Sequence, residues 1–240
     1  GAPEVAFHDG RELRGIPPNQ VTFTAAEAAE IRHGYFANIS FLDAQLGRVL
    51  DALEKSGQAE RTIIAFVADH GYHVGEHGLW AKTSNFEFDA HVPLLVAAPG
   101  VSVPGGQSDG VVELLDLFPT LVELCGLPKP EGLEGLSLAP ALRDPAATIK
   151  PAAFTQHPRP AYYDREPSKL PAAMGCSVRT PLVRYTEWRD WKTGAVVARE
   201  LYDAKLDPAE LRNAIDAPAL AAPQREAAAL LAKQFPPVKH

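Results

Sequence analysis

Titratable side chains crowd into one short stretch of the sequence, VADHGYHVGEHGLWAK, directly after a run of apolar residues. Asp69 and His70 are adjacent there, and together they could offer an oxygen and a nitrogen ligand to a divalent cation. Gly71 comes next, and glycine lets the backbone approach a neighbouring segment closely. Lys82 carries a compact charge that suits a tetrahedral oxyanion such as sulfate or phosphate. An acid, an imidazole and a lysine together indicate metal-assisted ester hydrolysis.

The same residue types also have a structural interpretation. An Asp-His pair at the end of a strand can be a capping aspartate and a surface histidine, and the spacing of Asp69 and His70 does not decide between the two roles. Lys82 taken alone could be solvated. His91 could be a satisfied histidine packed beneath the loop.

Two apolar segments flank this stretch and are expected to form a sheet. Residues 62–68 (TIIAFVA) and 92–98 (VPLLVAA) are apolar on both alternations, as expected for strands of a parallel sheet covered on both faces. Open α/β sheets hold their ligand sites just beyond the carboxyl ends of the strands. Asp69 and His70 follow the first strand directly, so they are expected at such a site.

Helices are predicted on both sides of these strands. Thr24 and Glu27 have capping-box spacing, apolar residues then recur every three or four positions, and Gly57 marks the end of the helix. One face of this helix is therefore expected to be buried. A second helix is predicted over 116–126, with Asp116 as its N-cap. The order of elements indicates an α/β fold.

The composition changes after the second helix, where a connector rich in proline and glycine begins. Residues 176–188 and 195–203 alternate around RDWKTG and predict an antiparallel hairpin. Residues 207–215 (DPAELRNAI) have the signature of a helix start. We therefore expect a large α/β domain over 1–149 and a small α+β subdomain over 150–240.

Composition and charge exclude several classes of function. The 240 residues carry a formal net charge of −7, which argues against a duplex nucleic-acid binder because such a protein needs a basic face. No apolar run approaches the roughly 18 residues that a membrane span needs. The two cysteines are too few for a disulfide framework, and no export signal is visible at the start of the sequence.

The run DHGYHVGEHGLWAK, with SNFEFDAHVPLLVAAPG behind it, resembles the sulfatase family of the alkaline-phosphatase-like superfamily, and most closely its iduronate-type subgroup. The resemblance runs from YFANISFLDAQLGRVLDAL to ELYDAKLDPAELRNAID and covers nearly the whole chain. It implies the C-terminal part of a mixed-sheet, alkaline-phosphatase-like α/β sulfatase fold, with a small α+β C-terminal subdomain.

The resemblance also implies roles for the titratable residues. Asp69 and His70 would be two ligands of a single divalent cation, most often Ca²⁺ in this family, and Lys82 would hold the substrate sulfate. Many sulfatases have asparagine at the position of His70, so the histidine favours the iduronate-type subgroup. Imidazole is not the ligand that calcium prefers, which leaves the identity of the metal open.

The family's nucleophile has no counterpart in this sequence. Sulfatases use a formylglycine made from Cys or Ser in a C/S-x-P-x-R motif, and an aspartate pair near their N-terminus completes the metal site. Cys125 precedes Gly-Leu-Pro and Cys176 precedes Ser-Val-Arg, so neither fits the motif, and both are expected to be small buried hydrophobic residues. The chain thus resembles the C-terminal half of a sulfatase, inactive alone, with the N-terminal half as a missing segment or a separate chain. The resemblance implies a periplasmic, secreted or lysosomal location.

The loop over 157–175 is expected to set substrate choice. By resemblance, the small subdomain roofs the active site and a basic side chain from this loop meets the carboxylate of a sulfated uronic acid in a glycosaminoglycan-type sugar. Arg165 lies at the matching place, and Tyr72 could pack against the sugar ring. Alternatively, Arg165 pairs with Asp164 or Glu166 in solvent.

Two other functions remain open. A phosphodiesterase or phosphonate hydrolase of the same superfamily would share the Asp-His pair. A non-catalytic binding subunit would equally lack the nucleophile.

Overall fold

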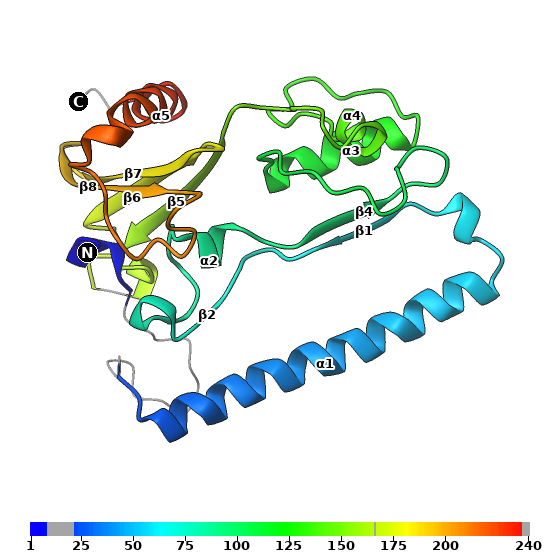
Figure 1. Ribbon diagram of the computed structural model, residues 1–240, viewed down its shortest axis with the longest axis horizontal. Helices are drawn as coiled ribbons and strands as arrows, with labels where there is room; N and C mark the ends of the chain where they lie inside the picture. The colour runs from blue at the N-terminus through cyan, green and yellow to red at the C-terminus, as the bar shows by residue number, and fades with distance from the viewer. Residues whose placement is uncertain (9–21, 166, 237–240) are drawn as a thin grey trace.

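The computed structural model describes residues 1–8, 22–165 and 167–236 of the chain. Figure 1 shows two units side by side, one containing β1 and β4 and the other a four-stranded sheet. The helices are α1 (Ala25–Lys55), α2 (Glu87–Ala90), α3 (Leu117–Leu124), α4 (Ala139–Arg143) and α5 (Ala221–Gln234), and the strands are β1 (Ile64–Val67), β2 (His73–Val74), β3 (Trp80–Ala81), β4 (Leu94–Ala97), β5 (Ala153–Arg159), β6 (Ala173–Arg179), β7 (Val183–Asp190) and β8 (Val196–Asp203).

Strands β1 and β4 form the two-stranded sheet of the first unit. They pair antiparallel, with Ile64 opposite Ala97 and Val67 opposite Leu94. The expected parallel relation between these two strands is therefore wrong. The chain between them forms the β2–β3 hairpin and the short helix α2, whereas a parallel connection needs a crossover of a dozen or more residues, usually a helix.

The faces of this sheet are also more open than its apolar sequence predicts. Figure 1 shows α1 on one side of β1 and β4, with α3 and α4 on the other. Alternate residues of β4 are nevertheless exposed, and Leu95 keeps 60% of its accessible surface. The prediction of strands covered on both faces fails within the described part of the chain.

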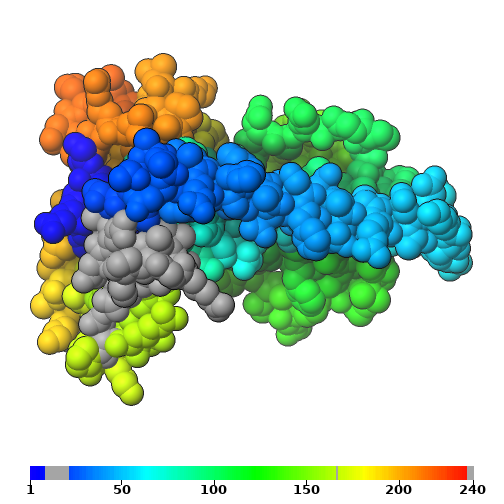
Figure 2. Space-filling view, turned by 90° about the horizontal axis from the view of Figure 1, so that it is seen from below, coloured from blue at the N-terminus to red at the C-terminus, as the bar shows by residue number. Residues whose placement is uncertain are grey.

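Helix α1 begins and ends where its sequence predicts. The Thr24 backbone N–H donates to the Glu27 carboxylate at 2.8 Å, and the Glu27 N–H donates to the Thr24 hydroxyl at 3.3 Å, so the capping box is formed. Past the end, Gly57 has a φ of +72°. The predicted burial of one face is not found within the described residues, where Ala28 is the one buried residue of the helix. Figure 2 shows α1 running across one whole face of the molecule.

Helix α3 forms within the predicted range, but the side chain of Asp116 does not cap it as predicted. Its carboxylate makes no hydrogen bond that caps α3. It accepts instead from the Leu136 N–H and from the Lys150 ammonium, at 2.8 and 2.7 Å. The aspartate therefore ties the connector after α3 to the helix start.

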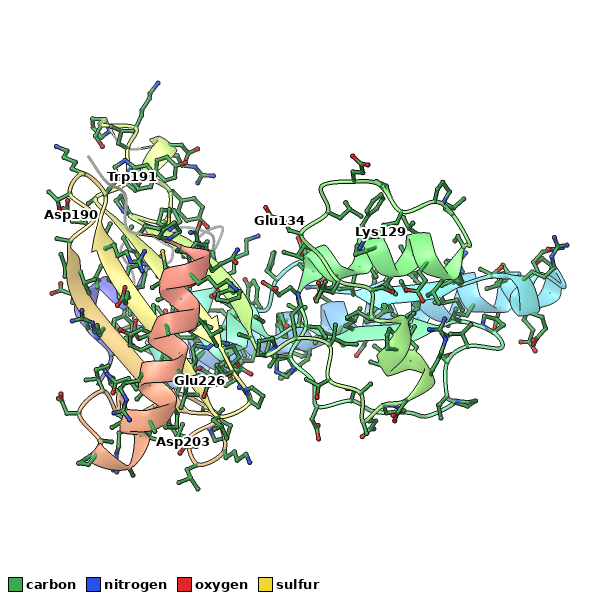
Figure 3. The ribbon with its side chains drawn as sticks, turned by 90° about the horizontal axis from the view of Figure 1, so that it is seen from above. Lys129, Glu134, Asp190, Trp191, Asp203 and Glu226 are labelled. Carbon is green, nitrogen blue, oxygen red and sulfur yellow. The ribbon has the colours of Figure 1, made fainter. Side chains whose placement is uncertain are left out.

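The second unit is an antiparallel sheet of order β5-β6-β7-β8 with α5 packed against it. Figure 3 shows α5 lying across the sheet, with Asp190 and Trp191 at the turn between β7 and β8. Its core includes Val178, Tyr185, Leu201 and Leu231. The division of the chain near residue 150 stays a prediction.

The predicted hairpin is confirmed for β7 and β8, whereas two other predictions for this unit are wrong. Residues 176–188 are two strands, because the chain turns at Thr180, whose N–H donates to the Val183 carbonyl at 2.8 Å. Residues 207–215 are not helical, and Glu210 there has a φ of +56°. The structure forms α5 farther along instead. No helix in the described ranges combines the length and apolarity needed to cross a membrane.

Candidate active site

The turn after β1 is fixed by the backbone of α2. The Gly71 N–H donates to the Asp89 carbonyl at 2.8 Å, and the Tyr72 N–H donates to the Phe88 carbonyl at 3.0 Å. A Cβ atom on Gly71 would lie 1.8 Å from the Phe88 carbonyl oxygen. Glycine is therefore required by this close approach, as the sequence predicts.

This turn brings Asp69, His70 and Lys82 together. The His70 Nδ1 atom lies 2.7 Å from the Gly71 carbonyl, which selects the tautomer with the proton on Nδ1. Its Nε2 atom then accepts from the Lys82 ammonium at 2.9 Å. The Asp69 carboxylate lies 3.6 Å from the same Nε2 atom and is 89% exposed.

These groups match part of a divalent metal site. A carboxylate and an imidazole nitrogen lie side by side, and a ring N–H bonded to a backbone carbonyl is the usual way in which a ligating histidine is oriented. Among the described residues no group of three or more His, Cys, Asp and Glu side chains could hold a cation. Asp69 and His70 therefore fit as two donors of a site that needs more, and Nε2 would have to release Lys82 in order to bind the cation.

Lys82 is positioned by the hairpin of β2 and β3. His73 pairs with Ala81, and the fully buried His73 ring lies 3.0 Å from the Asp89 carboxylate. The Ser84 N–H and hydroxyl also donate to Asp89, at 2.7 and 2.6 Å. Burial alone would raise the pKa of Asp89, but the hydrogen bonds from His73 and Ser84 outweigh it and lower the pKa. A buried anion therefore joins the hairpin to α2.

A cluster of buried groups near this anion was not predicted from the sequence. Burial, followed by the charge of Arg159, lowers the pKa of both His8 and His157 to about 4, although Asp89 opposes the change. The Arg159 guanidinium donates to the Ala6 carbonyl at 2.6 Å and to the Thr83 carbonyl at 2.9 Å. No local pattern marks these residues, because their partners lie far away in the chain.

A second set of long-range contacts connects α2 to the four-stranded sheet. The buried Arg184 guanidinium contacts Glu87 and donates to Glu210 at 2.7 Å. The Glu210 carboxylate also accepts from the Glu87 N–H at 2.7 Å. Burial would raise the pKa of Glu87, but hydrogen bonds from His91 and the charges of Arg184 and Arg179 lower it overall. The prediction of His91 as a packed histidine is wrong, since its side chain is 76% exposed and lies 3.3 Å from Glu87.

The two predicted sugar-binding residues contact other parts of the protein. Tyr72 stacks on Tyr35 of α1, with ring centroids 5.1 Å apart. The Arg165 guanidinium lies 4.6 Å from the centroid of the Tyr162 ring. Pairing of Arg165 with Glu166 lies outside the described residues. Both assignments stay predictions.

The cysteines differ from each other in burial. Cys176 is buried in β6, and burial raises the pKa of its thiol. Cys125 is exposed at the end of α3, so its predicted burial is wrong. Apolar residues near it are exposed as well, with Phe118 at 55% and Leu127 at 59%.

Two family models match the chain. The model described as Sulfatase matches residues 8–127, and the model described as N-sulphoglucosamine sulphohydrolase, C-terminal, matches residues 75–235. Together with an α/β sheet whose strand-end turn holds an Asp-His pair beside a lysine, these matches define the class. The chain belongs to the sulfatase family.

Individual relatives agree with this placement. Human iduronate 2-sulfatase is 35% identical over 89% of this chain and 50% of its own length. The structure of BT4656 in complex with its substrate D-glucosamine-2-N,6-O-disulfate has a TM-score of 0.72 at 27% identity, covering 89% of this chain and 47% of that one. The phosphonate monoester hydrolase of Agrobacterium radiobacter has a TM-score of 0.71 at 30% identity, covering 88% and 42%.

The comparisons confirm the predicted fold class, a mixed α/β sulfatase fold of the alkaline-phosphatase-like type. The chain spans 50% of the length of human iduronate 2-sulfatase, 47% of the BT4656 chain and 34% of human arylsulfatase K.

Proposed function

We propose that this chain is the C-terminal part of a sulfatase that hydrolyses sulfate esters of a uronic acid in a glycosaminoglycan-type sugar. The observation that carries the proposal is the 2.9 Å contact between the Lys82 ammonium and His70 Nε2, beside the Asp69 carboxylate. It places a cationic group for a sulfate oxygen next to two donors for a divalent metal. Sulfatase relatives that cover most of the chain support it.

The chain's own residues would bind and orient the sulfate. Lys82 would neutralise charge on a sulfate oxygen as the ester bond breaks, and a fixed charge of this kind stabilises a transition state strongly when water is excluded. Asp69 and His70 would hold the cation, with Ca²⁺ as the proposed ion. When bound, such a cation polarises the sulfate oxygens as a Lewis acid. The bond from His70 Nδ1 to the Gly71 carbonyl keeps the ring oriented.

The nucleophile is proposed to come from elsewhere. Cys176 has a buried thiol with a raised pKa and no C/S-x-P-x-R motif, and exposed Cys125 lacks the motif as well. Human iduronate 2-sulfatase and the BT4656 chain are about twice as long as the region matched in each. We propose that an N-terminal half supplies the formylglycine and the remaining metal ligands, that the 240-residue chain alone turns over no substrate, and that the complete enzyme is periplasmic, secreted or lysosomal.

Hydrolysis of a sulfate ester by the full-length protein tests the proposal. The full-length protein should hydrolyse a 2-sulfated uronate. Lys82→Ala should lower kcat/KM, because the activation free energy should rise by roughly 2–4 kcal/mol, as for loss of an oxyanion donor. An unchanged kcat/KM in that variant would contradict the role of Lys82.

Phosphonate ester hydrolysis is the second candidate, favoured by the similarity to the phosphonate monoester hydrolase of Agrobacterium radiobacter. A kcat/KM for a phosphonate monoester above that for every sulfate ester tested would select this function. Elemental analysis of the purified full-length protein would then be expected to give zinc or manganese in place of calcium.

A further inference from the structure

The backbone on both sides of Lys82 adopts a conformation that L-residues rarely take. Ala81 has a φ of +71° and Thr83 a φ of +88°. Left-handed backbone is uncommon for residues other than glycine, asparagine and aspartate, and for a β-branched residue such as threonine it is an outlier. Lys82 is thus flanked by two strained residues, where glycine would be the relaxed choice.

Nothing local to these residues compensates for the strain. Alanine has no polar group that could bond to its own backbone. The buried Thr83 hydroxyl has no hydrogen-bond partner among residues 1–8, 22–165 and 167–236. The conformation is therefore imposed by the surroundings.

Those surroundings hold the turn from both sides. Ala81 is fully buried and pairs with His73 in the β2–β3 hairpin. Next to Lys82, the Thr83 carbonyl accepts from the Arg159 guanidinium at 2.9 Å, and both the N–H and the hydroxyl of Ser84 donate to Asp89. Strained backbone persists only where the surrounding structure over-determines it, and it concentrates at functional sites.

We propose that the left-handed backbone at Ala81 and Thr83 is a positioning device that aims the Lys82 ammonium at the oxyanion site beside His70. This inference rests on the proposed function of Lys82. The two residues contact no substrate themselves. They restrict the directions that the lysine backbone can take, so that less conformational freedom is lost when the anion binds.

Substitution by glycine at either position distinguishes an effect on sulfate binding from an effect on stability. Ala81→Gly and Thr83→Gly relax the left-handed backbone, so the melting temperature of the full-length protein should stay the same or rise. The affinity for inorganic sulfate, measured as competitive inhibition and by calorimetry, should nevertheless fall about two- to fivefold in each variant. A stabilised protein that binds its anion less well is the result that a merely structural role would not give.

Two control variants complete the experiment. Thr83→Ala keeps a Cβ atom and the strained backbone but removes the hydroxyl, so sulfate affinity should match the parent. Ala232→Gly introduces glycine at an exposed position of α5, where it should lower the melting temperature and leave sulfate affinity unchanged.

The outcomes are distinct from those for the proposed function. Unchanged sulfate affinity in Lys82→Ala would overturn the role of Lys82 and this inference together. Weakened affinity in Lys82→Ala with parental affinity in both glycine variants would overturn this inference alone. A lowered melting temperature in both glycine variants would also overturn it, because the Ala81 and Thr83 side chains would then stabilise the turn. An equal loss of affinity in Thr83→Ala would assign the effect to the hydroxyl and overturn the role of Thr83 backbone strain.

Discussion

At the scale of single residues, the site depends on short contacts around one imidazole ring. His70 uses Nδ1 toward the Gly71 carbonyl and Nε2 toward Lys82, and Asp69 lies on the same side of the ring. Each contact gives a specific expectation for a substitution.

The first expectation concerns the metal. Replacing Asp69 with Ala removes a carboxylate ligand from the proposed site and should abolish binding of the divalent cation to the full-length protein, since calcium affinity depends on the number of charged oxygen ligands. Elemental analysis after gel filtration measures the occupancy. Full occupancy in the variant would show that Asp69 is not a ligand.

The second expectation concerns the close approach at Gly71. Gly71→Ala forces a Cβ atom against the Phe88 carbonyl and should destabilise the fold by about 1–3 kcal/mol, the usual cost of overpacking. Denaturant unfolding measures the change. Gly47→Ala is the matched control, because a Cβ atom there meets nothing within 4 Å, and in the middle of α1 it should stabilise by about 0.5–1 kcal/mol. Equal stability of Gly71→Ala and the parent protein would mean that α2 can move away from the turn.

The third expectation concerns substrate choice. If Arg165 leaves the Tyr162 ring to meet a sugar carboxylate, Arg165→Ala should lower the preference for a 2-sulfated uronate over its carboxyl-reduced analogue by roughly 1.5–3 kcal/mol, the scale of a charged hydrogen bond. The ratio of kcat/KM values for the two substrates gives this preference. The same ratio in parent and variant would leave Arg165 as a partner of Tyr162 only.

At the scale of elements, α1 is the feature that the described residues explain least. Its apolar stripe consists of Ile39, Leu42, Leu46, Val49, Leu50 and Leu53. Leu42 and Val49 are 56% and 64% exposed. We expect the proposed N-terminal half to cover this stripe, because an apolar helix face of this length normally packs against another layer.

Charged substitutions on α1 test whether the N-terminal half covers its apolar stripe. Leu42→Glu and Val49→Glu should each destabilise the full-length protein by about 1.5–3 kcal/mol, the value of a buried aliphatic side chain, and should change the 240-residue chain little. Denaturant unfolding of both proteins gives the comparison. Ala44→Glu, on the opposite face of the helix, should be neutral in both. If the stripe variants were neutral in the full-length protein as well, the stripe would be a solvent-facing surface.

At the scale of the whole molecule, buried histidines tie stability to pH. His8 lies in the N-terminal segment and His157 in β5, and both have a folded-state pKa of about 4 against an ordinary value of 6.5. The unfolded state therefore binds more protons than the folded state between these two values. The contribution of these two histidines to the free energy of unfolding is fully present above pH 6.5 and should be lost as the pH drops from about 6.5 to about 4, by at most about 3 kcal/mol for each histidine.

Unfolding at a series of pH values measures this dependence. His8→Gln and His157→Gln each remove one titrating group, so each should flatten the curve between pH 4 and 6.5. A curve of unchanged slope in both variants would assign the acid sensitivity to other groups.

The local features of the chain were determined by its sequence. Thr24 and Glu27 mark the start of α1, and Gly57 marks its end, because a capping box and a left-handed glycine act over only three or four residues. The hairpin of β7 and β8 follows from alternation on both sides of a turn. The string of residues around Asp69 also identified the family correctly.

Tertiary structure decided everything that depends on partners distant in the chain. The segment 207–215 has a helix-start signature, yet Glu210 bonds to Arg184 and to the Glu87 N–H, 123 residues away, and the segment stays irregular. The α1 stripe has the period of a buried face, but period alone does not say which segment covers it. The contact of Lys82 with His70 and the strained backbone beside it arise from packing around Asp89 and Arg159. Local patterns bias φ and ψ through near neighbours, whereas side-chain positions in a site are set by the close packing of segments that meet only in the folded molecule.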